Sequence, residues 1–304
     1  MNMKKVQVFL STYNGEKYLQ EQIESLLQQK GVQISILVRD DGSTDCTLSI
    51  LEKYKEVGKI DFYTGDNMGY AKSFLDLVKQ DVHADYYAFC DQDDVWLPEK
   101  LNVAIKQIER FQEDSEKIPA LYASALQRVD QNLNLLPLQN FKNLRLTLGA
   151  EFTRHRLAGC SFVFNNQLRD ILRKAENIEC SHDRLTTILC LACGGKIFFD
   201  KNSYILFRRH GSNTSPDGIG TKKKIEKDVR HYFSGKNNAD VLAKQIISQY
   251  DDYLSENSRR FLLEVRNYKQ NWFNTIKLGL SNQIDCGFWY FNIFIRAMIL
   301  LQLF

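Results

Sequence analysis

Short apolar runs alternate with helical patterns through the first third of the chain. The runs are VQVFL, ISILV, DFYT and YYAFC, and the patterns between them predict helices over residues 16–29, 47–55 and 71–79. Strands that alternate with helices form βαβ units with parallel strands. The pattern therefore predicts an α/β fold with a mostly parallel central sheet flanked by helices.

Helix boundaries carry recognisable residues. Asn14 is a candidate N-cap for the first helix, and Pro98 is suited to the first turn of a helix whose apolar stripe includes Leu101, Ile105 and Ile108. These boundaries fix where the intervening strands end, and ligands of such sheets bind beyond the carboxyl ends of the strands.

Beyond residue 121 the pattern is less regular. Irregular strands and loops are expected over 121–148, then a strand at GCSFVFN, helices over 167–175 and 184–193, and strands at KIFFD and SYILF. We expect the α/β domain to span residues 1–216. Residues 217–304 are expected to form a helical, basic and aromatic C-terminal segment.

Composition narrows the functional classes. Apolar residues make up 44% and charged residues 25%, and residues 1–221 carry 27 basic and 29 acidic side chains against 13 and 8 in residues 222–304. The first two thirds therefore lack the basic face of a nucleic-acid-binding protein. Seven scattered cysteines and a start without a signal-peptide pattern favour the cytoplasm.

Four polar loops directly follow predicted strands. They are STYNGE, DDGSTD, GDNMGYAKS and DQDD. Because carboxyl ends of parallel strands share one edge of a sheet, these loops are expected to meet at one ligand site. Alone, DDGSTD is also typical of an Asp/Gly turn with a helix cap. In this series its carboxylates could accept the N3 hydrogen of a uracil or thymine base.

The DQDD turn concentrates negative charge. Asp91, Asp93 and Asp94 lie within four residues, which is costly unless the charges are solvated, protonated or neutralised by a cation. Oxygen ligands suit Mg²⁺ or Mn²⁺, which often bridge carboxylates to substrate phosphates. An exposed acidic turn before a helix is the alternative.

Two later motifs complete the candidate site. Asp183 precedes a predicted helix, so it is either an N-cap or, across a cleft from a metal diphosphate, a general base for a hydroxyl. His210 ends a predicted strand in RRHGSNTS, where a polar surface role is the simple interpretation. Its neighbours Arg208 and Arg209 could contact phosphate.

Taken together, these motifs resemble the family 2 glycosyltransferases over residues 5–216. The resemblance rests on VFLSTYNGEKYLQEQIESLLQQ, VRDDGSTD, DQDDVWLPEKL, the HD before a helix and RRHGSN, in that order. It implies a GT-A fold and an inverting, metal-dependent transfer from a nucleoside diphosphate sugar. DQDDVW and HGSN are most similar to bacterial rhamnosyltransferases of cell-wall and surface polysaccharide synthesis.

The resemblance implies a donor of dTDP-L-rhamnose, with a UDP-sugar as the alternative, and a glycan or polyprenyl-linked acceptor. Asp183 would be the catalytic base, Asp41 would bind the nucleobase with support from Asp40, and Asp93 with His210 would bind Mn²⁺ or Mg²⁺. The remaining nucleotide-sugar site would comprise Ser11, Tyr13, Glu16, Asn67, Lys72, Asp91 and Gln92. HDRLTT lacks the bulky aromatics that often follow HD, which leaves the acceptor open.

The chain ends in DCGFWYFNIFIRAMILLQLF. This stretch is near membrane-spanning length but is interrupted by Asp285 and Arg296. An amphipathic helix at the inner face of the plasma membrane is expected, and packing on the α/β domain or in a homodimer is an equal alternative.

Two other functional classes fit parts of the sequence. YYAFCDQDDV matches the strand and DxDxV turn of haloacid-dehalogenase-like phosphohydrolases, although that motif normally follows the first core strand. A catalytically silent nucleotide-sugar-binding protein is the second alternative.

Overall fold

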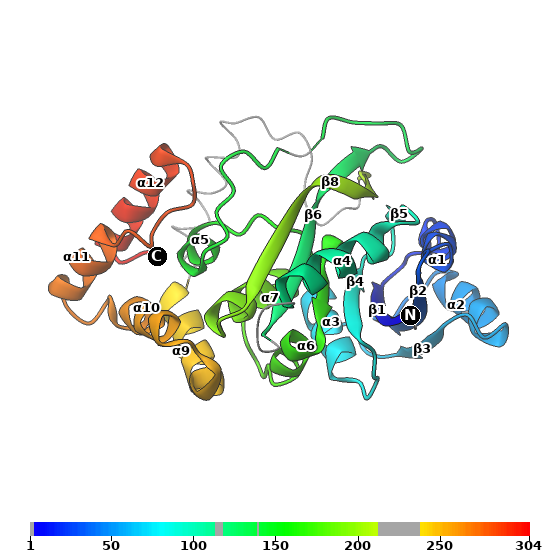
Figure 1. Cartoon of the computed structure of the whole chain (residues 1–304), viewed down its shortest axis with the longest axis horizontal. Coiled ribbons are helices and arrows are strands. Elements are labelled where there is room, and N and C mark those ends of the chain that lie inside the picture. The colour runs from blue at the N-terminus through cyan, green and yellow to red at the C-terminus, as the bar shows by residue number, and fades with distance from the viewer. Residues whose placement is uncertain (1–2, 113–117, 139, 212–237) are drawn as a thin grey trace.

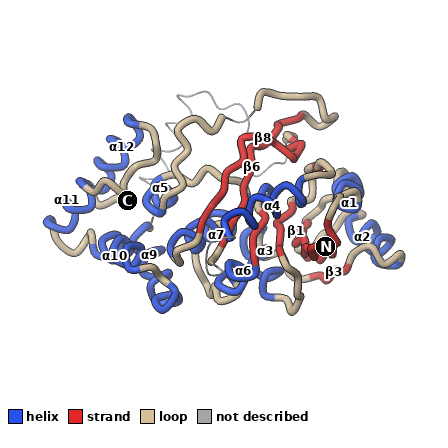
Figure 2. Tube along the Cα trace, viewed as in Figure 1, coloured by secondary structure: helices blue, strands red, loops and turns tan. Residues whose placement is uncertain are grey.

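The computed structural model describes residues 3–112, 118–138, 140–211 and 238–304, and the structural statements below refer to these residues. Its centre is one eight-stranded sheet with the strand order β3-β2-β1-β4-β7-β6-β8-β5 (Figures 1 and 2). The strands are β1 (Lys4–Thr12), β2 (Val32–Asp40), β3 (Asp61–Thr64), β4 (Tyr86–Cys90), β5 (Val95–Trp96), β6 (Ala120–Val129), β7 (Val163–Asn165) and β8 (Lys196–Arg208).

The sheet is mixed, with a parallel N-terminal half. Strands β3, β2, β1 and β4 are mutually parallel, and β6 is parallel to β8. The short β7 is antiparallel to both β4 and β6, and β5 is antiparallel to β8. The predicted α/β fold with a mostly parallel sheet is confirmed.

Helices cover both faces of this sheet, as Figure 2 shows. Side chains alternate along β1, so Val8 and Leu10 enter one hydrophobic cluster and Phe9 enters the other. The helices are α1 (Leu19–Leu27), α2 (Thr47–Glu56), α3 (Tyr70–Lys79), α4 (Lys100–Gln112), α5 (Leu148–Thr153), α6 (Asn166–Leu172), α7 (His182–Ala192), α9 (Ala239–Tyr250), α10 (Glu256–Asn267), α11 (Trp272–Leu280) and α12 (Trp289–Leu300).

Two predicted helix caps are wrong. Asn14 does not cap α1, whose N-cap is Tyr18. It has φ of 48° instead, and its side-chain oxygen accepts a hydrogen bond from Thr44 N, which ties the first polar loop to the second. Helix α7 begins at His182 with Ser181 as N-cap, so Asp183 lies in its first turn and is not the N-cap.

The middle of the chain is more regular than its sequence suggests. The expected irregular segment begins with β6, a ten-residue strand. KIFFD and SYILF belong to the single strand β8, and the polar residues between them coincide with a break in the β6–β8 register after Asp200. A β-bulge absorbs these residues without ending the strand.

The C-terminal helices α9–α12 form the end of the molecule opposite α2 (Figure 1). Ile246, Phe261 and Ile295 belong to the same hydrophobic cluster as Phe9, so these helices share a core with the sheet. The expected boundary near Pro216 and the lysine run after it lie outside the described residues. Within those residues, no helix has the length and apolarity needed to cross a membrane.

Candidate active site

A cleft of about 780 Å³ opens at the carboxyl ends of β1, β2 and β4. It brings together side chains from all four polar loops, from the start of α7 and from the end of β8. Ten of the twelve predicted site residues line it, namely Ser11, Tyr13, Glu16, Asp41, Asn67, Asp91, Gln92, Asp93, Asp183 and His210. The loops therefore meet as the sequence predicts.

The other two predicted residues do not line the cleft. Asp40 is fully buried and accepts hydrogen bonds from the Gly42 and Ser43 backbone N–H groups, so it shapes the DDGSTD turn. Lys72 is exposed on α3, a helix whose Ser73 and Phe74 are buried. The helical period turns Lys72 away from the buried face of α3.

Asp41 joins two of the loops. Its carboxylate is buried, forms an ion pair with Arg39, and accepts hydrogen bonds from the backbone N–H groups of Met68 (3.2 Å) and Gly69 (2.9 Å). Arg39 in turn forms an ion pair with Asp76 at 3.1 Å. The paired charges satisfy one another in the protein interior and fix the GDNMG loop against the DDGSTD loop.

Gln92 holds the first loop in place. Its Oε1 accepts hydrogen bonds from Thr12 Oγ1 (2.6 Å) and Tyr13 N (2.9 Å), and its Nε2 donates to Tyr13 O (3.1 Å). A Cβ at Gly15 would lie closer than 3.0 Å to Gln92 Oε1 and Thr12 Oγ1, so a larger residue there would displace these side chains. The amide of Gln92 is thus engaged by the protein itself.

The end of β8 clamps the DQDD turn. His210 Nε2 lies 2.8 Å from Asp93 Oδ2, while Arg208 donates from Nε to Asp93 O (2.8 Å) and from its backbone N–H to Asp94 Oδ1 (3.1 Å). Arg208 also pairs with Glu21 and does not line the cleft. Of the two arginines, only Arg209 lines it.

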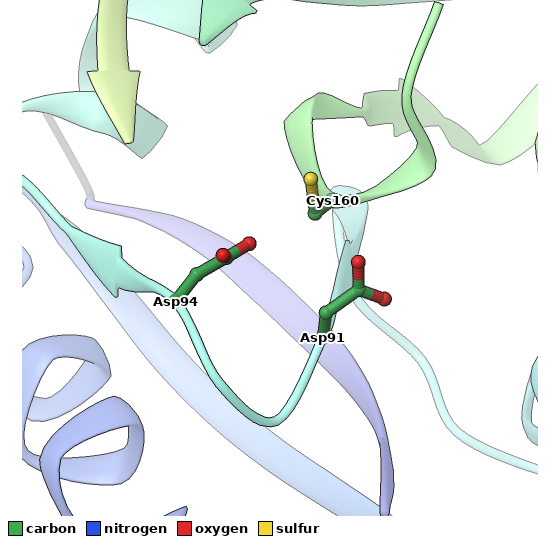
Figure 3. Close-up of side chains that lie close together, drawn as sticks. All are labelled: Asp91, Asp94 and Cys160. Carbon is green, nitrogen blue, oxygen red and sulfur yellow. The ribbon is translucent and has the colours of Figure 1, made fainter. Parts of the chain in front are cut away.

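Two sets of side chains near this turn could meet a cation. Asp91, Asp94 and Cys160 have ligand atoms within 4.8 Å of one another (Figure 3). However, Asp94 and Cys160 are buried and do not line the cleft. Cysteine sulfur is also a soft ligand, which suits Mg²⁺ or Mn²⁺ poorly. Asp93 and His210, which line the cleft, are the better donor pair.

Asp183 faces the DQDD turn across the cleft. Burial, then Asp93 and Asp183, raise the pKa of Asp91 to about 7. Burial also acts to raise the pKa of Asp183, but His155 and His182 outweigh it and leave that pKa below its usual value. Asp183 is therefore an ionised carboxylate at neutral pH, as a general base must be.

His182 packs rather than titrates. Its ring stacks on Phe74 at 4.1 Å and meets Phe89 edge-on at 5.0 Å, and burial lowers its pKa to about 4. Gly159 closes the remaining side, where a Cβ would lie closer than 3.0 Å to His182 Nε2. These contacts fix the first turn of α7 and so the backbone that carries Asp183.

Two residues beside the candidate base, Glu151 and His155, are not predicted from the sequence. His155 Nδ1 lies 2.5 Å from Glu151 Oε2, and His155 Nε2 lies 3.5 Å from Asp183 Oδ2. The available signal is the spacing of Glu and His four residues apart in EFTRH, which favours a contact only if the segment is helical.

Comparison with known proteins identifies the family of the chain. The model of "Glycosyl transferase family 2" matches residues 7–171, more than half of the chain. The dTDP-rhamnosyl transferase RfbG of Shigella flexneri is 29% identical over 235 residues, which cover 72% of this chain and 77% of that protein. An uncharacterized glycosyltransferase of Rickettsia typhi is 24% identical over 73% of this chain and 69% of its own.

Solved structures match the fold. S. aureus TarS 1–349 in complex with UDP-GlcNAc has a TM-score of 0.58 at 20% identity, covering 92% of this chain and 78% of that chain. The haloacid-dehalogenase alternative is wrong, because the DQDD turn follows β4 of a glycosyltransferase sheet. The chain belongs to glycosyl transferase family 2, has the GT-A fold and is similar to a rhamnosyltransferase.

Proposed function

We propose that this glycosyltransferase moves L-rhamnose from dTDP-L-rhamnose to a hydroxyl of a glycan or polyprenyl-linked acceptor, with inversion at the anomeric carbon. The observation that carries the proposal is the position of Asp183. It lies in the same cleft as the nucleotide loops and the DQDD turn, and it is held ionised.

In the proposed step, Asp183 accepts the proton of the acceptor hydroxyl as its oxygen attacks the anomeric carbon. The bond from that carbon to the diphosphate oxygen breaks, and its electron pair leaves with the nucleoside diphosphate. Attack opposite the leaving group inverts the configuration. One oxygen of the carboxylate, Oδ1, already accepts a hydrogen bond from Arg184 N (2.8 Å), which restrains its rotation.

Asp93 and His210 would hold the divalent metal, because Asp93 supplies a hard carboxylate oxygen and His210 a borderline imidazole nitrogen, in contact at 2.8 Å on the cleft wall. When bound, Mn²⁺ or Mg²⁺ would stabilise the negative charge of the departing diphosphate. Arg209, which lines the same wall, is a further candidate for phosphate binding.

The donor is tested by calorimetry with dTDP-L-rhamnose, UDP-GlcNAc and the free nucleoside diphosphates, each with and without Mn²⁺. We expect the tightest metal-dependent binding for dTDP-L-rhamnose, in line with the relative named as a dTDP-rhamnosyl transferase. A preference for UDP-GlcNAc would contradict the proposed donor but not the proposed mechanism. Absence of nucleotide binding would overturn the proposal.

The base is tested with Asp183→Asn, which keeps the shape of the side chain and removes its basicity. We expect dTDP-L-rhamnose to bind within about twofold of wild type and its turnover to fall at least about 10²-fold. Asp252→Asn, at an exposed carboxylate of η2 (Asp251–Tyr253), is the matched control. Near wild-type turnover in Asp183→Asn would refute the base assignment. Binding without turnover in the wild type would favour the silent binding protein.

We further propose that α11 and α12 dock the enzyme on an anionic membrane surface. Large apolar side chains are exposed along both helices, namely Trp272, Phe273, Ile276, Leu280, Trp289, Tyr290, Ile293 and Leu300. The two charged residues that interrupt the apolar C-terminal stretch, Asp285 and Arg296, form hydrogen bonds within the protein. Arg296 donates to the carbonyls of Ser281 and Ile284, and Asp285 accepts from Gly287 N and Asn292 Nδ2.

The aromatic content of this surface and the basic excess of residues 222–304 favour a lipid headgroup region over a second protein. Of the three tryptophans, Trp96 is buried while Trp272 and Trp289 are exposed on the surface, so tryptophan fluorescence reports on it. Vesicles with phosphatidylglycerol should shift the emission to the blue, and neutral vesicles should shift it less.

The double variant Phe273→Ser/Ile293→Ser should weaken vesicle binding, whereas Val57→Ser/Leu135→Ser, at exposed apolar residues elsewhere, should not. Turnover of dTDP-L-rhamnose in detergent should be the same in both. A molecular mass twice 35.4 kDa in solution, lost only in the first variant, would assign the surface to a homodimer instead.

A further inference from the structure

A buried carboxylate and a histidine stand behind the proposed base. Glu151, on α5, is almost fully buried and accepts hydrogen bonds from Thr187 Oγ1 (2.8 Å) and His155 Nδ1 (2.5 Å) at its Oε2. His155 follows α5 by two residues, and its Nε2 lies 3.5 Å from Asp183 Oδ2, just beyond normal hydrogen-bond length. The three side chains form a continuous row from α5 to the cleft.

This row restrains the base from both sides. Asp183 Oδ1 accepts from the Arg184 backbone N–H, and Oδ2 faces His155. Arg184 is itself tied to α5, because its guanidinium donates to the Glu151 and Phe152 carbonyls at 3.0 Å. The carboxylate of Asp183 therefore lies between its own helix, which is tied to α5 through Arg184, and His155, which follows α5.

The groups around His155 also set its charge. The titratable or charged groups around His155 are Glu151 from α5, His182, Asp183 and Arg184 from α7, and Cys180 just before α7. Burial lowers the pKa of His155, but the two carboxylates outweigh it and raise that pKa to about 9. His155 is a cation at neutral pH, and it lowers the pKa of the Asp183 carboxyl.

We propose that His155, anchored by Glu151, is a positioning residue that holds Asp183 ionised and correctly oriented before the acceptor binds. The proposal rests on the proposed function, in which Asp183 is the base. No step of the reaction places His155 on the substrate, since it acts through the carboxylate.

The contacts among Glu151, His155 and Asp183 predict how turnover depends on pH. Protonation of Asp183 would stop turnover, so removal of the His155 cation, which should raise the pKa of Asp183, should make turnover fall at a higher pH on the acid side than in the wild type. At alkaline pH, His155 loses its Nε2 proton as pH rises through about 9, and turnover should fall. Glu151→Gln removes the anion that favours the cation, so it should move this alkaline limb to lower pH.

The test uses the purified full chain, with release of dTDP from dTDP-L-rhamnose to water as the readout, because no acceptor need be known. His155→Gln should lower kcat about ten- to a hundredfold, with the dTDP-L-rhamnose Kd within about twofold, because a misplaced catalytic group affects rate more than binding. His83→Gln is the matched control, at a histidine whose side chain is 83% exposed.

A second measurement does not depend on turnover. The imidazole signals of the five histidines can be titrated by NMR, and His155, assigned by its absence in His155→Gln, should titrate near pH 9 in the wild type and at lower pH in Glu151→Gln. A wild-type His155 that titrates below pH 7 would overturn the proposal whatever the turnover of the variants.

Different results would contradict the proposed function and the positioning role of His155. If Asp183→Asn keeps wild-type turnover, the proposed function fails. If Asp183→Asn is inactive while His155→Gln keeps the wild-type kcat and the wild-type pH dependence on the acid side, only the positioning role fails. A lowered melting temperature with an unchanged pH profile would likewise reduce the row to a structural contact between α5 and α7.

Discussion

A methyl group added at Gly159 would press on the residue that precedes the proposed base. The Cβ of Gly159→Ala would lie closer than 3.0 Å to His182 Nε2 and 3.3 Å from Asp183 Cβ. His182 cannot withdraw, because Phe74 stacks on its ring at 4.1 Å and Phe89 abuts it at 5.0 Å. Relief must therefore come from separating the 3-10 helix Gly159–Ser161 from the first turn of α7.

The size of that separation sets the expected effect. Non-bonded heavy atoms are in contact at about 3.5 Å, so the two segments must part by roughly 1 Å. Overpacking of this kind costs about 1–3 kcal/mol of stability. A displacement of about 1 Å at a catalytic group lowers the rate by about 10²-fold.

The assay compares dTDP release from dTDP-L-rhamnose with donor binding and thermal unfolding in the same preparation. Gly159→Ala should lose about 10²-fold in kcat, and the loss should shrink when His182→Ala is added, because the clash is removed. Gly279→Ala, in α11, is the control, since its Cβ would meet only ordinary contacts with α12, at 3.7 Å or more. A folded Gly159→Ala enzyme with wild-type kcat would show that this contact does not position Asp183.

The remaining predictions concern the metal and a buried lysine. Asp93→Asn should remove both the Mn²⁺ dependence and most of the rate of dTDP release; full wild-type activity in excess chelator would exclude the metal role. Lys100 is fully buried with its Nζ 3.5 Å from the Trp96 ring centroid, and burial lowers its pKa from 10.5 to about 7. Between these values the unfolded chain binds a proton that the folded chain does not, so Lys100 contributes a term that raises the free energy of unfolding as pH rises. His155, whose pKa is raised, contributes a term of opposite sign, so the test is the difference between variants. The change in the free energy of urea unfolding from pH 7.5 to 9.5 should be more positive in the wild type and in Lys53→Met than in Lys100→Met; an equal change in Lys100→Met would place the titration elsewhere.

The alternation of apolar runs and helices was sufficient to predict the parallel half of the sheet. Each strand from β1 to β4 is short, apolar and followed by a polar loop, and parallel strands bring such loops to one edge. Ser11, Asp41 and Asp91 follow from this rule, because each lies at or just beyond a strand end. Local sequence therefore determined most of the cleft.

Local sequence could not place contacts between distant segments. Whether Lys72 or its buried neighbour Ser73 faces inward depends on the rotation of α3 against the sheet. The sequence of β8 predicts two strands, but the structure has one strand with a bulge opposite β6. Pairing partners far apart in the chain decide where a strand ends. For the same reason, Arg208 lies beneath the DQDD turn rather than in the cleft.

Periodicity and the residues next to strand ends were enough to predict the fold class, the polar loops and the carboxylates of the site. The surroundings of Asp183 could be known only from the folded chain. His155 approaches Asp183 from the segment after α5, with Glu151 of α5 behind it, and the charge of His155 favours the ionised form of Asp183, which depends on distances in space and on desolvation rather than on neighbours in the chain.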